Sequence, residues 1–350
     1  MHASALDLHD LGWDGGFAAA FEPYEQEGLV PARVAAQHRG GYDVLGEAGE
    51  RRARVSGRLR HEAGSAADLP AVGDWVALRD ETIQAVLPRR SAFSRKAAWA
   101  PTEEQVLAAN LDSVFVVTAL DGDLNLRRLE RYLTLVWESG AGPVIVLTKA
   151  DLCEDVGAAL LAIEPVAIGV PAHAVSNLTG AGLEELEPHL APARTIALLG
   201  SSGVGKSSLA NRLVGGELQA TKEIAEDGRG RHTTTSRQLI RLPRGALLVD
   251  TPGLRELQLW VADDGFHEAF ADVDELAAEC RFNDCSHTRE PGCAVRAAID
   301  EGRLPLARLQ SYRQLQRELE RLALKRDARL RSEARKKRAA FARSMRRPSW

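Results

Sequence analysis

The stretch Gly200-Ser-Ser-Gly-Val-Gly-Lys-Ser207 decides the fold of this chain. It fits the pattern G-x-x-x-x-G-K-[ST] of a phosphate-binding loop. The apolar run 195–199 before it predicts a buried strand, and the leucine spacing in 208–213 after it predicts a helix. A Gly/Ser turn before an ordinary helix is the alternative, but every fixed position of the pattern is filled and both flanks fit.

The loop is suited to an anion because its glycines let several backbone N–H groups turn inward, and the helix start adds a partial positive charge. Lys206 can reach the outer phosphates, and the Ser207 hydroxyl can hold Mg²⁺. The nucleotide-binding residues expected here are Gly200, Ser201, Ser202, Gly203, Val204, Gly205, Lys206, Ser207 and Ser208.

Asp250-Thr-Pro-Gly253 follows the apolar run 246–249, about fifty residues after the phosphate loop. A carboxylate at that strand end can hold Mg²⁺ through water, and the Gly253 N–H can bind a γ-phosphate. Alone the D-x-x-G pattern is weak evidence for a nucleotide site, but beside a phosphate loop it indicates a nucleoside triphosphatase. We therefore expect Asp250 and Gly253 in the site.

Thr148-Lys-Ala-Asp151 ends another predicted strand. The Asp151 carboxylate can accept two hydrogen bonds from guanine, which adenine cannot offer, and buried polar groups reject a base that leaves them unpaired. We expect Thr148, Lys149 and Asp151 to read the base. This element precedes the phosphate loop, whereas it follows the loop in ordinary GTP-binding domains, so the order indicates a circular permutation.

From about 110 to 256 the pattern alternates between strand and helix, which predicts a mostly parallel, doubly wound sheet. An apolar helix face is expected between the first two strands. The predicted strands are 113–118, 143–148, 165–168, 195–199, 237–241 and 246–250.

Residues 28–98 read as five short strands separated by glycine-rich turns, which favours a small oligonucleotide-binding (OB) type barrel. The third of these strands is expected over 52–59. Barrels of this type commonly bind nucleic acid, and several arginines would supply charge, although the barrel could serve only as a spacer. Residues 1–27 are weakly patterned and predict a mobile or loosely docked leader.

The formal net charge of −4 is unevenly spread. Residues 321–350 hold twelve Lys/Arg against Asp327 and Glu333, so this tail carries about +10 and the remainder about −14. A basic arm favours an anionic partner such as RNA, and a solvated helix is the alternative. We expect neither a secretory signal nor a membrane span, and hence a soluble cytoplasmic protein.

Three of the four cysteines crowd into Cys280-(x4)-Cys285-x-His287-(x5)-Cys293. Three sulfurs and one imidazole form a closed tetrahedral set for one structural zinc ion per chain, with no open position for catalysis. Buried cysteines with an incidental histidine are the alternative. We expect Cys153, which stands apart, to be a small core residue.

Together these motifs resemble the circularly permuted GTPases that depend on the small ribosomal subunit, the RsgA/YjeQ/EngC family. The resemblance runs over about 28–320 and includes Ala71-Val-Gly-Asp-Trp-Val76 and Gly230-Arg-His-Thr-Thr-Thr235. It implies action in late small-subunit assembly and three domains: a barrel, a permuted α/β GTPase domain and a zinc domain. We therefore divide the chain into leader 1–27, OB-type barrel 28–98, GTPase domain 99–264, α-helical zinc domain 265–320 and basic helical tail 321–350.

The resemblance also implies that Ser176 and Asn177 form a second base-contacting loop through backbone groups, and it assigns roles in hydrolysis. It implies that 215–235 is the first switch, in which Thr234, or else Thr233, completes the Mg²⁺ shell with Ser207 and Asp250. Leu254 stands where many GTPases have a water-positioning glutamine. We therefore expect His232 to orient the water, with RNA contact or loop capping as its alternative roles, and Lys206 to act at the phosphates.

One residue departs from the family pattern: Thr148 replaces the usual asparagine and cannot make both contacts of an amide. We expect weaker nucleotide affinity with guanine choice retained through Asp151. The leading hypothesis is a monomeric GTPase that hydrolyses GTP to GDP on the small subunit and its rRNA and then leaves. The alternatives are an RNA-binding assembly module in which GTP only tunes affinity, and an ATP-using protein, which Asp151 disfavours.

Overall fold

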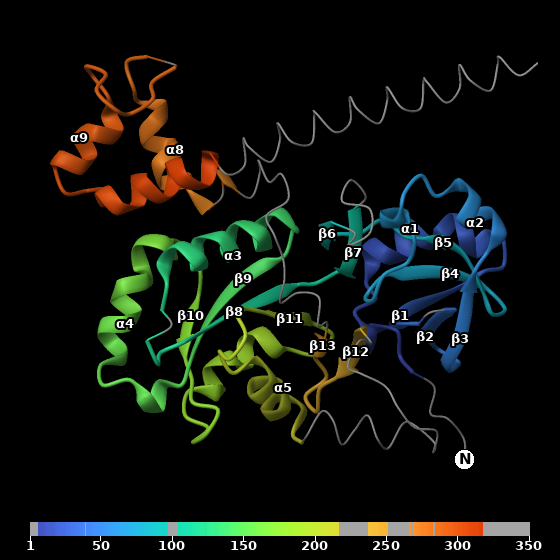
Figure 1. Cartoon of the computed structure of the whole chain (residues 1–350). Helices are drawn as coiled ribbons and strands as arrows, with labels where there is room; N and C mark the ends of the chain where they lie inside the picture. Colours follow the sequence, from blue (N-terminus) through green and yellow to red (C-terminus); the bar gives the residue numbers. More distant parts are fainter. Residues whose placement is uncertain are drawn as a thin grey trace, which may run out of the picture.

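The computed structural model describes residues 6–38, 40–96, 104–122, 124–216, 237–250, 266–267, 269–282 and 284–317. A five-stranded barrel, a central sheet with helices on both faces and a small helical C-terminal part follow one another along the chain (Figure 1).

The barrel closes in the order β1-β2-β3-β5-β4, with β4 pairing back onto β1. The β3–β5 pair is parallel and the other four pairs are antiparallel. This confirms the predicted OB-type barrel. Its strands are β1 (Val30–His38), β2 (Gly41–Gly46), β3 (Gly49–Val55), β4 (Trp75–Arg79) and β5 (Thr82–Val86).

The third barrel strand is shorter than the sequence predicts. It ends at Val55, and residues 57–59 begin helix α2 (Gly57–Glu62) instead of continuing the strand. The cause is Ser56, whose side chain accepts a hydrogen bond from the Leu59 N–H and so caps the helix. The short 3₁₀ helix η2 (Ala66–Asp68) completes this connection.

Residues 6–27 of the leader pack against the barrel, so the expectation of a mobile or loosely docked segment is wrong for them. It forms η1 (His9–Leu11) and helix α1 (Gly15–Gln26), which buries Phe17 and Phe21. The ring of Trp13 lies with its centroid 4.7 Å from that of Trp75 on β4. Because side chains alternate along a strand, β4 turns Val76 into the barrel and Trp75 toward the leader.

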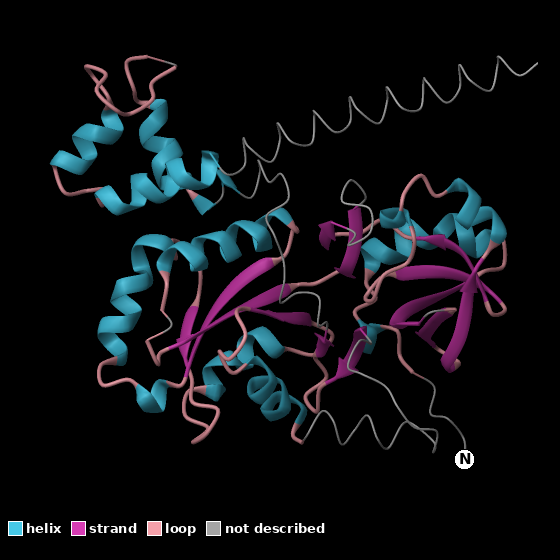
Figure 2. Ribbon diagram, viewed as in Figure 1, coloured by secondary structure: helices cyan, strands magenta, loops and turns pink. Residues whose placement is uncertain are grey.

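The central sheet has the order β10-β9-β8-β11-β13-β12, in which every pair is parallel except β13–β12. Figure 2 shows helices on both of its faces. This confirms the doubly wound sheet. Its strands are β8 (Ser113–Ala119), β9 (Gly142–Thr148), β10 (Ala172–Ala174), β11 (Thr195–Leu199), β12 (Arg237–Arg241) and β13 (Leu247–Asp250), and its helical elements are α3 (Leu126–Glu138), η3 (Ala150–Leu152), α4 (Val156–Ile163), η4 (Glu164–Val166), η5 (Leu183–Leu190) and α5 (Lys206–Val214).

Side chains alternate along each buried strand, so successive residues point to opposite faces of the sheet. On β8, Val114 and Val116 belong to the same core cluster as Leu133 of α3, whereas Phe115 and Val117 belong to the cluster that contains Leu209 of α5. The long apolar strands are therefore sandwiched between two helix layers, as a parallel sheet requires.

One local prediction fails in this region, and one hairpin was not predicted. Residues 164–166 form the 3₁₀ turn η4, and the edge strand is β10, a few residues later. Pro165 has no N–H to donate to a ladder, which disfavours a strand there. A hairpin that the sequence did not predict, β6 (Ala92–Lys96) with β7 (Glu104–Ala109), lies between barrel and sheet, and the expected boundary at 98 falls inside it.

Barrel and central sheet are joined edge to edge. Strand β12 pairs antiparallel with β1 through Ala36 with Gln238 and Gln37 with Arg237. Eleven strands thus form one continuous hydrogen-bonded sheet. The outer edge of the central sheet, strand β12, is thus paired by the barrel (Figure 1).

The C-terminal part contains α8 (Ala271–Ala278), α9 (Ala294–Asp300) and helical residues 306–317, and it lies over α3 (Figure 1). Arg308 fixes this contact: its guanidinium donates to Glu130 on α3 at 2.9 Å and to Asp272 on α8 at 2.8 Å. None of the helices in the described part of the chain combines the length and apolarity needed to cross a membrane.

Candidate nucleotide site and metal centre

The predicted phosphate loop joins the end of β11 to the start of α5. Gly200 must be glycine, because a Cβ there would lie 2.2 Å from the Val117 carbonyl oxygen. Lys206 is largely buried, and its Nζ donates to the Gly200 carbonyl at 2.7 Å. The helix N-terminus, with Ser207 and Ser208 in its first turn, adds the positive end of the helix dipole to this loop.

The predicted base-reading element follows β9. Lys149 adopts a left-handed backbone conformation, with φ of 59°, and pairs with Asp121. Asp151 lies in η3, where its Oδ1 accepts a hydrogen bond from the Ser176 hydroxyl at 2.5 Å. The two segments expected to contact the base are therefore bonded to each other.

Both base-reading segments also contact the phosphate loop. The fully buried Thr148 hydroxyl donates to the Val204 carbonyl at 2.5 Å. The Asn177 side-chain Nδ2 donates to the Gly205 carbonyl at 3.2 Å. A hydrogen-bonded path thus runs from Asp151 through Ser176 and its neighbour Asn177 to the loop.

Asp250 ends β13, the parallel neighbour of β11, so it stands beside the start of the phosphate loop. Because carboxyl ends of parallel strands share one edge, the sheet brings Asp250, the phosphate loop and Thr148 to the same edge. His232, Thr233, Thr234, Gly253 and Leu254 lie outside the described residues, as does the tail 321–350.

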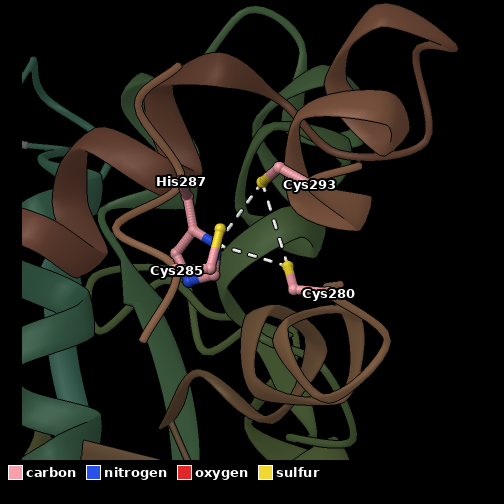
Figure 3. A group of neighbouring side chains, drawn as sticks. All are labelled: Cys280, Cys285, His287 and Cys293. Atoms are coloured by element: carbon pink, nitrogen blue, oxygen red, sulfur yellow. Dashed lines mark hydrogen bonds between the residues drawn. The ribbon is translucent and has the colours of Figure 1, made fainter. Parts of the chain in front are cut away.

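The predicted zinc ligands converge on one point in the C-terminal part (Figure 3). One ligand atom from each of Cys280, Cys285, His287 and Cys293 lies within 4.8 Å of the others. The Cys280 Sγ is 3.9 Å from the Cys293 Sγ, and His287 Nδ1 is 3.6 Å from the Cys280 Sγ and 3.5 Å from the Cys293 Sγ. Two sulfurs each about 2.3 Å from a tetrahedral zinc ion would be about 3.8 Å apart.

The surroundings of His287 fit a ligand as well. Its backbone is left-handed, with φ of 56°, which turns the ring toward the three sulfurs. Burial, with help from Arg313, lowers the pKa of His287 and favours the neutral imidazole that a metal requires. The donor set and spacing therefore fit a structural zinc ion, which Cys₃His would bind with no open position.

Comparison with known proteins identifies the family. The family model described as RsgA GTPase matches residues 86–260, which covers the predicted nucleotide-binding motifs. The chain belongs to the RsgA GTPase family. It is accordingly a GTP hydrolase of the circularly permuted kind, and the predicted base-reading element precedes the phosphate loop in its sequence.

Relatives match along most of this RsgA GTPase. Small ribosomal subunit biogenesis GTPase RsgA 2 of Lactiplantibacillus plantarum is 51% identical over 301 residues, covering 84% of this chain and 85% of the relative. Small ribosomal subunit biogenesis GTPase RsgA of Streptomyces coelicolor is 47% identical over 345 residues, covering 96% of this chain and 93% of the relative. The crystal structure of YjeQ from Thermotoga maritima superposes with a TM-score of 0.63 at 26% identity, covering 83% of this chain and 98% of that one.

Some contacts of this RsgA GTPase were not predicted. The Asn177 side chain bonds to the phosphate loop, whereas the sequence pattern suggested only backbone contacts from its segment. Tyr132 of α3 places its hydroxyl 3.2 Å from the Ser201 hydroxyl. Arg212 of α5 donates to the Asn177 carbonyl at 2.8 Å. Only Asn177 could have been found, because it lies inside a segment already singled out.

Proposed function

We propose that this chain binds GTP with Mg²⁺ at the carboxyl edge of the central sheet, hydrolyses it on the small ribosomal subunit during late assembly, and then leaves. The observation that carries the proposal is the bonded path from Asp151 to the phosphate loop. It supports recognition of a single guanine nucleotide by both elements, because a carboxylate for the base and a cradle for the phosphates are held at a fixed spacing.

The proposed nucleotide contacts are divided among the predicted residues. The glycine-rich loop and Lys206 would hold the phosphates, and Gly253 the γ-phosphate. Oxygen ligands suit Mg²⁺, and Ser207, Asp250 and Thr234 would hold it. The ion would neutralise charge on the transferred phosphoryl group. His232 is proposed to orient the water.

The proposed partner is the small subunit and its rRNA. The relatives' names support this, since they are called small ribosomal subunit biogenesis GTPases. On the barrel, Arg54 and Arg60 line a groove of about 640 Å³ together with His38, which supports contact with an anionic backbone. We propose that the barrel (28–98) and the C-terminal parts (265–320 and 321–350) grip rRNA in the cytoplasm, while the GTPase domain (99–264) times release.

Multiple-turnover GTP hydrolysis with and without purified small subunits tests this function. We expect slow turnover alone, strong stimulation by small subunits, and competition by GDP but not by ADP. Lys206→Ala is the inactive control, because its loss removes the phosphate-binding ammonium group. Turnover that small subunits leave unchanged would contradict the proposal.

One observation favours a second function. Leu254 follows Gly253 and cannot hydrogen-bond to a water molecule, so intrinsic hydrolysis should be slow. In that case the chain would be an RNA-binding assembly module whose affinity GTP tunes. Small subunits that bind GTP-loaded protein tightly yet never raise turnover would favour this alternative.

A further inference from the structure

The inference concerns the side of the phosphate loop that faces the base-reading segments. Thr148 is fully buried there, and its hydroxyl donates to the Val204 carbonyl at 2.5 Å, with the Thr118 carbonyl 3.3 Å away. A hydroxyl carries a single proton, so Thr148 can donate one strong bond to the loop at a time. Its neighbour along the loop, the Gly205 carbonyl, accepts from the Leu209 N–H at 2.9 Å and has a second lone pair open to a side-chain donor.

Asn177 supplies that donor. Its Nδ2 donates to the Gly205 carbonyl at 3.2 Å. Gly205 is itself in a left-handed conformation, with φ of 90°, and a Cβ there would lie 3.1 Å from Asn177 Nδ2 and 3.5 Å from the Thr148 hydroxyl. Two side chains from two separate segments therefore hold two consecutive carbonyl groups of one turn.

The segment that carries Asn177 is fixed at several points. Arg212 of α5 donates to the Asn177 carbonyl at 2.8 Å and to the Leu178 carbonyl at 2.8 Å. The preceding Ser176 donates to Asp151. The position of the amide is thus set from both the helix after the phosphate loop and the base-reading carboxylate.

The oxygen of the Asn177 side-chain amide has an unusual environment. Asn177 Oδ1 is buried, and it has no hydrogen-bond partner in the part of the chain that the structure describes. Buried polar atoms are nearly always paired, so an unpaired one at a functional site calls for a reason. The hydrogen bond from Nδ2 to Gly205 is therefore the contact by which this buried amide acts on the loop.

We propose that Asn177 is a positioning residue that acts with Thr148 as a clamp on the phosphate loop. The clamp comprises the Thr148 hydroxyl on Val204 and the Asn177 amide on Gly205. It supplies, from a second segment, the amide contact that a threonine at position 148 cannot make, and it keeps the loop at the spacing from Asp151 that one guanine nucleotide spans. This inference rests on the proposed guanine-nucleotide site.

The test is the dissociation constant for fluorescently labelled GDP, measured on the full chain. Asn177→Ala should weaken binding about tenfold, the size of one neutral hydrogen bond. In the Asn177→Ala background, Thr148→Asn should restore binding to within about threefold of the wild type, because it returns an amide to the loop. Leu178→Ala is the matched control, since Leu178 is the next residue and is 76% exposed.

A second pair of variants guards against a failure to fold. Thr148→Val keeps the shape and removes the hydroxyl, and its effect on GDP binding should not add to that of Asn177→Ala if the two act as one clamp. Unfolding midpoints without nucleotide should match between Asn177→Ala and Leu178→Ala. Unchanged GDP affinity in Asn177→Ala, or a loss that Thr148→Asn does not repair, overturns the clamp. If the wild type itself does not prefer GDP to ADP, the proposed function fails instead.

Discussion

At the scale of single residues, the candidate site depends on carboxylates and hydroxyls held by neighbouring side chains. One carboxylate oxygen of Asp151 accepts a hydrogen bond from the Ser176 hydroxyl, which fixes the plane of the carboxylate. The remaining acceptor capacity is what a guanine base would use. Base choice should therefore follow the chemistry of this one group.

The first prediction is that Asp151→Asn exchanges guanine for xanthine. An amide donor in place of one carboxylate oxygen suits the C2 carbonyl of xanthine and loses the charge-assisted bonds to guanine. We expect GTP affinity to fall about 100-fold, since such bonds are worth about 1.5–3 kcal/mol, and XTP affinity to rise. Competition binding checks this, with the helix-capping Asp155→Asn as the control. Retained GTP preference would contradict it.

Much of the arrangement of the candidate site residues could be predicted from the sequence, because the motifs fix both the residue types and their spacing. Gly200, Lys206, Asp151 and Asp250 lie at one sheet edge as their positions at strand ends predict. The Arg308–Glu130 contact was not predictable, because it joins residues 178 apart and nothing local marks either one. Buried pairs of this kind are set by packing between elements.

At the scale of elements, the leader helix shows how tertiary contacts override a weak local pattern. Asp14 caps α1 by accepting from the N–H groups of Gly16 and Phe17, and it forms an ion pair with Arg90. The Arg90 guanidinium is the main cause that lowers the pKa of Asp14, to about 2. Neither the aromatic contacts nor this pair has a local sequence signature.

The second prediction concerns pH. Since the pKa of Asp14 is lowered from 3.8 to about 2 in the folded protein, its stabilising contribution is full above about pH 4 and is lost as the pH falls toward 2. The pair is about half exposed, so we expect only about 0.5–1 kcal/mol.

The comparison is the unfolding free energy of wild type and Asp14→Asn at pH 6 and pH 2.5. Asparagine keeps the cap and removes the charge. The wild type should be more stable at pH 6, and the difference should shrink at pH 2.5. A difference independent of pH would show that the charge on Asp14 does not contribute.

The third prediction concerns the metal cluster. Helices α8 and α9 are short and flank the four ligands, so a zinc ion should stabilise this part directly. Protein purified without chelator should contain about one zinc per chain, and strong chelators should reduce its helical circular dichroism. Cys285→Ser should lose zinc, whereas Cys153→Ser, away from the cluster, should keep it. Full helicity in metal-free protein would contradict this prediction.

At the scale of the whole molecule, a buried ion-pair cluster links the C-terminal part to the central domain. Arg308 and Glu130 are 2% and 3% exposed. Arg308 also donates to Asp272, and its guanidinium lies 4.3 Å from the centre of the Phe270 ring. Burial raises the pKa of Glu130, and hydrogen bonds from Ser311 and Arg308 oppose that rise.

The fourth prediction is that Arg308→Ala lowers the free energy of unfolding by about 3–5 kcal/mol, because it leaves the buried Glu130 carboxylate without its cationic partner. Arg303→Ala is the control, since its pair with Glu301 is more than half exposed and should change stability by less than about 0.5 kcal/mol. Chemical denaturation measures both. A loss below about 1 kcal/mol for Arg308→Ala would mean that solvent or other groups compensate.

The edge-to-edge pairing of β12 with β1 has a mechanical consequence. Residues 217–236, which include Thr234, lead directly into β12, and the described residues of β12 pair with β1 at two positions. A strand cannot slide gradually along its neighbour, because a one-residue step turns every side chain to the opposite face. We therefore expect a movement of β12 to have one of two results. Either β1 and the barrel move together with β12, or the hydrogen bonds between β12 and β1 break. The groove on the barrel would then be either fully displaced or left in place.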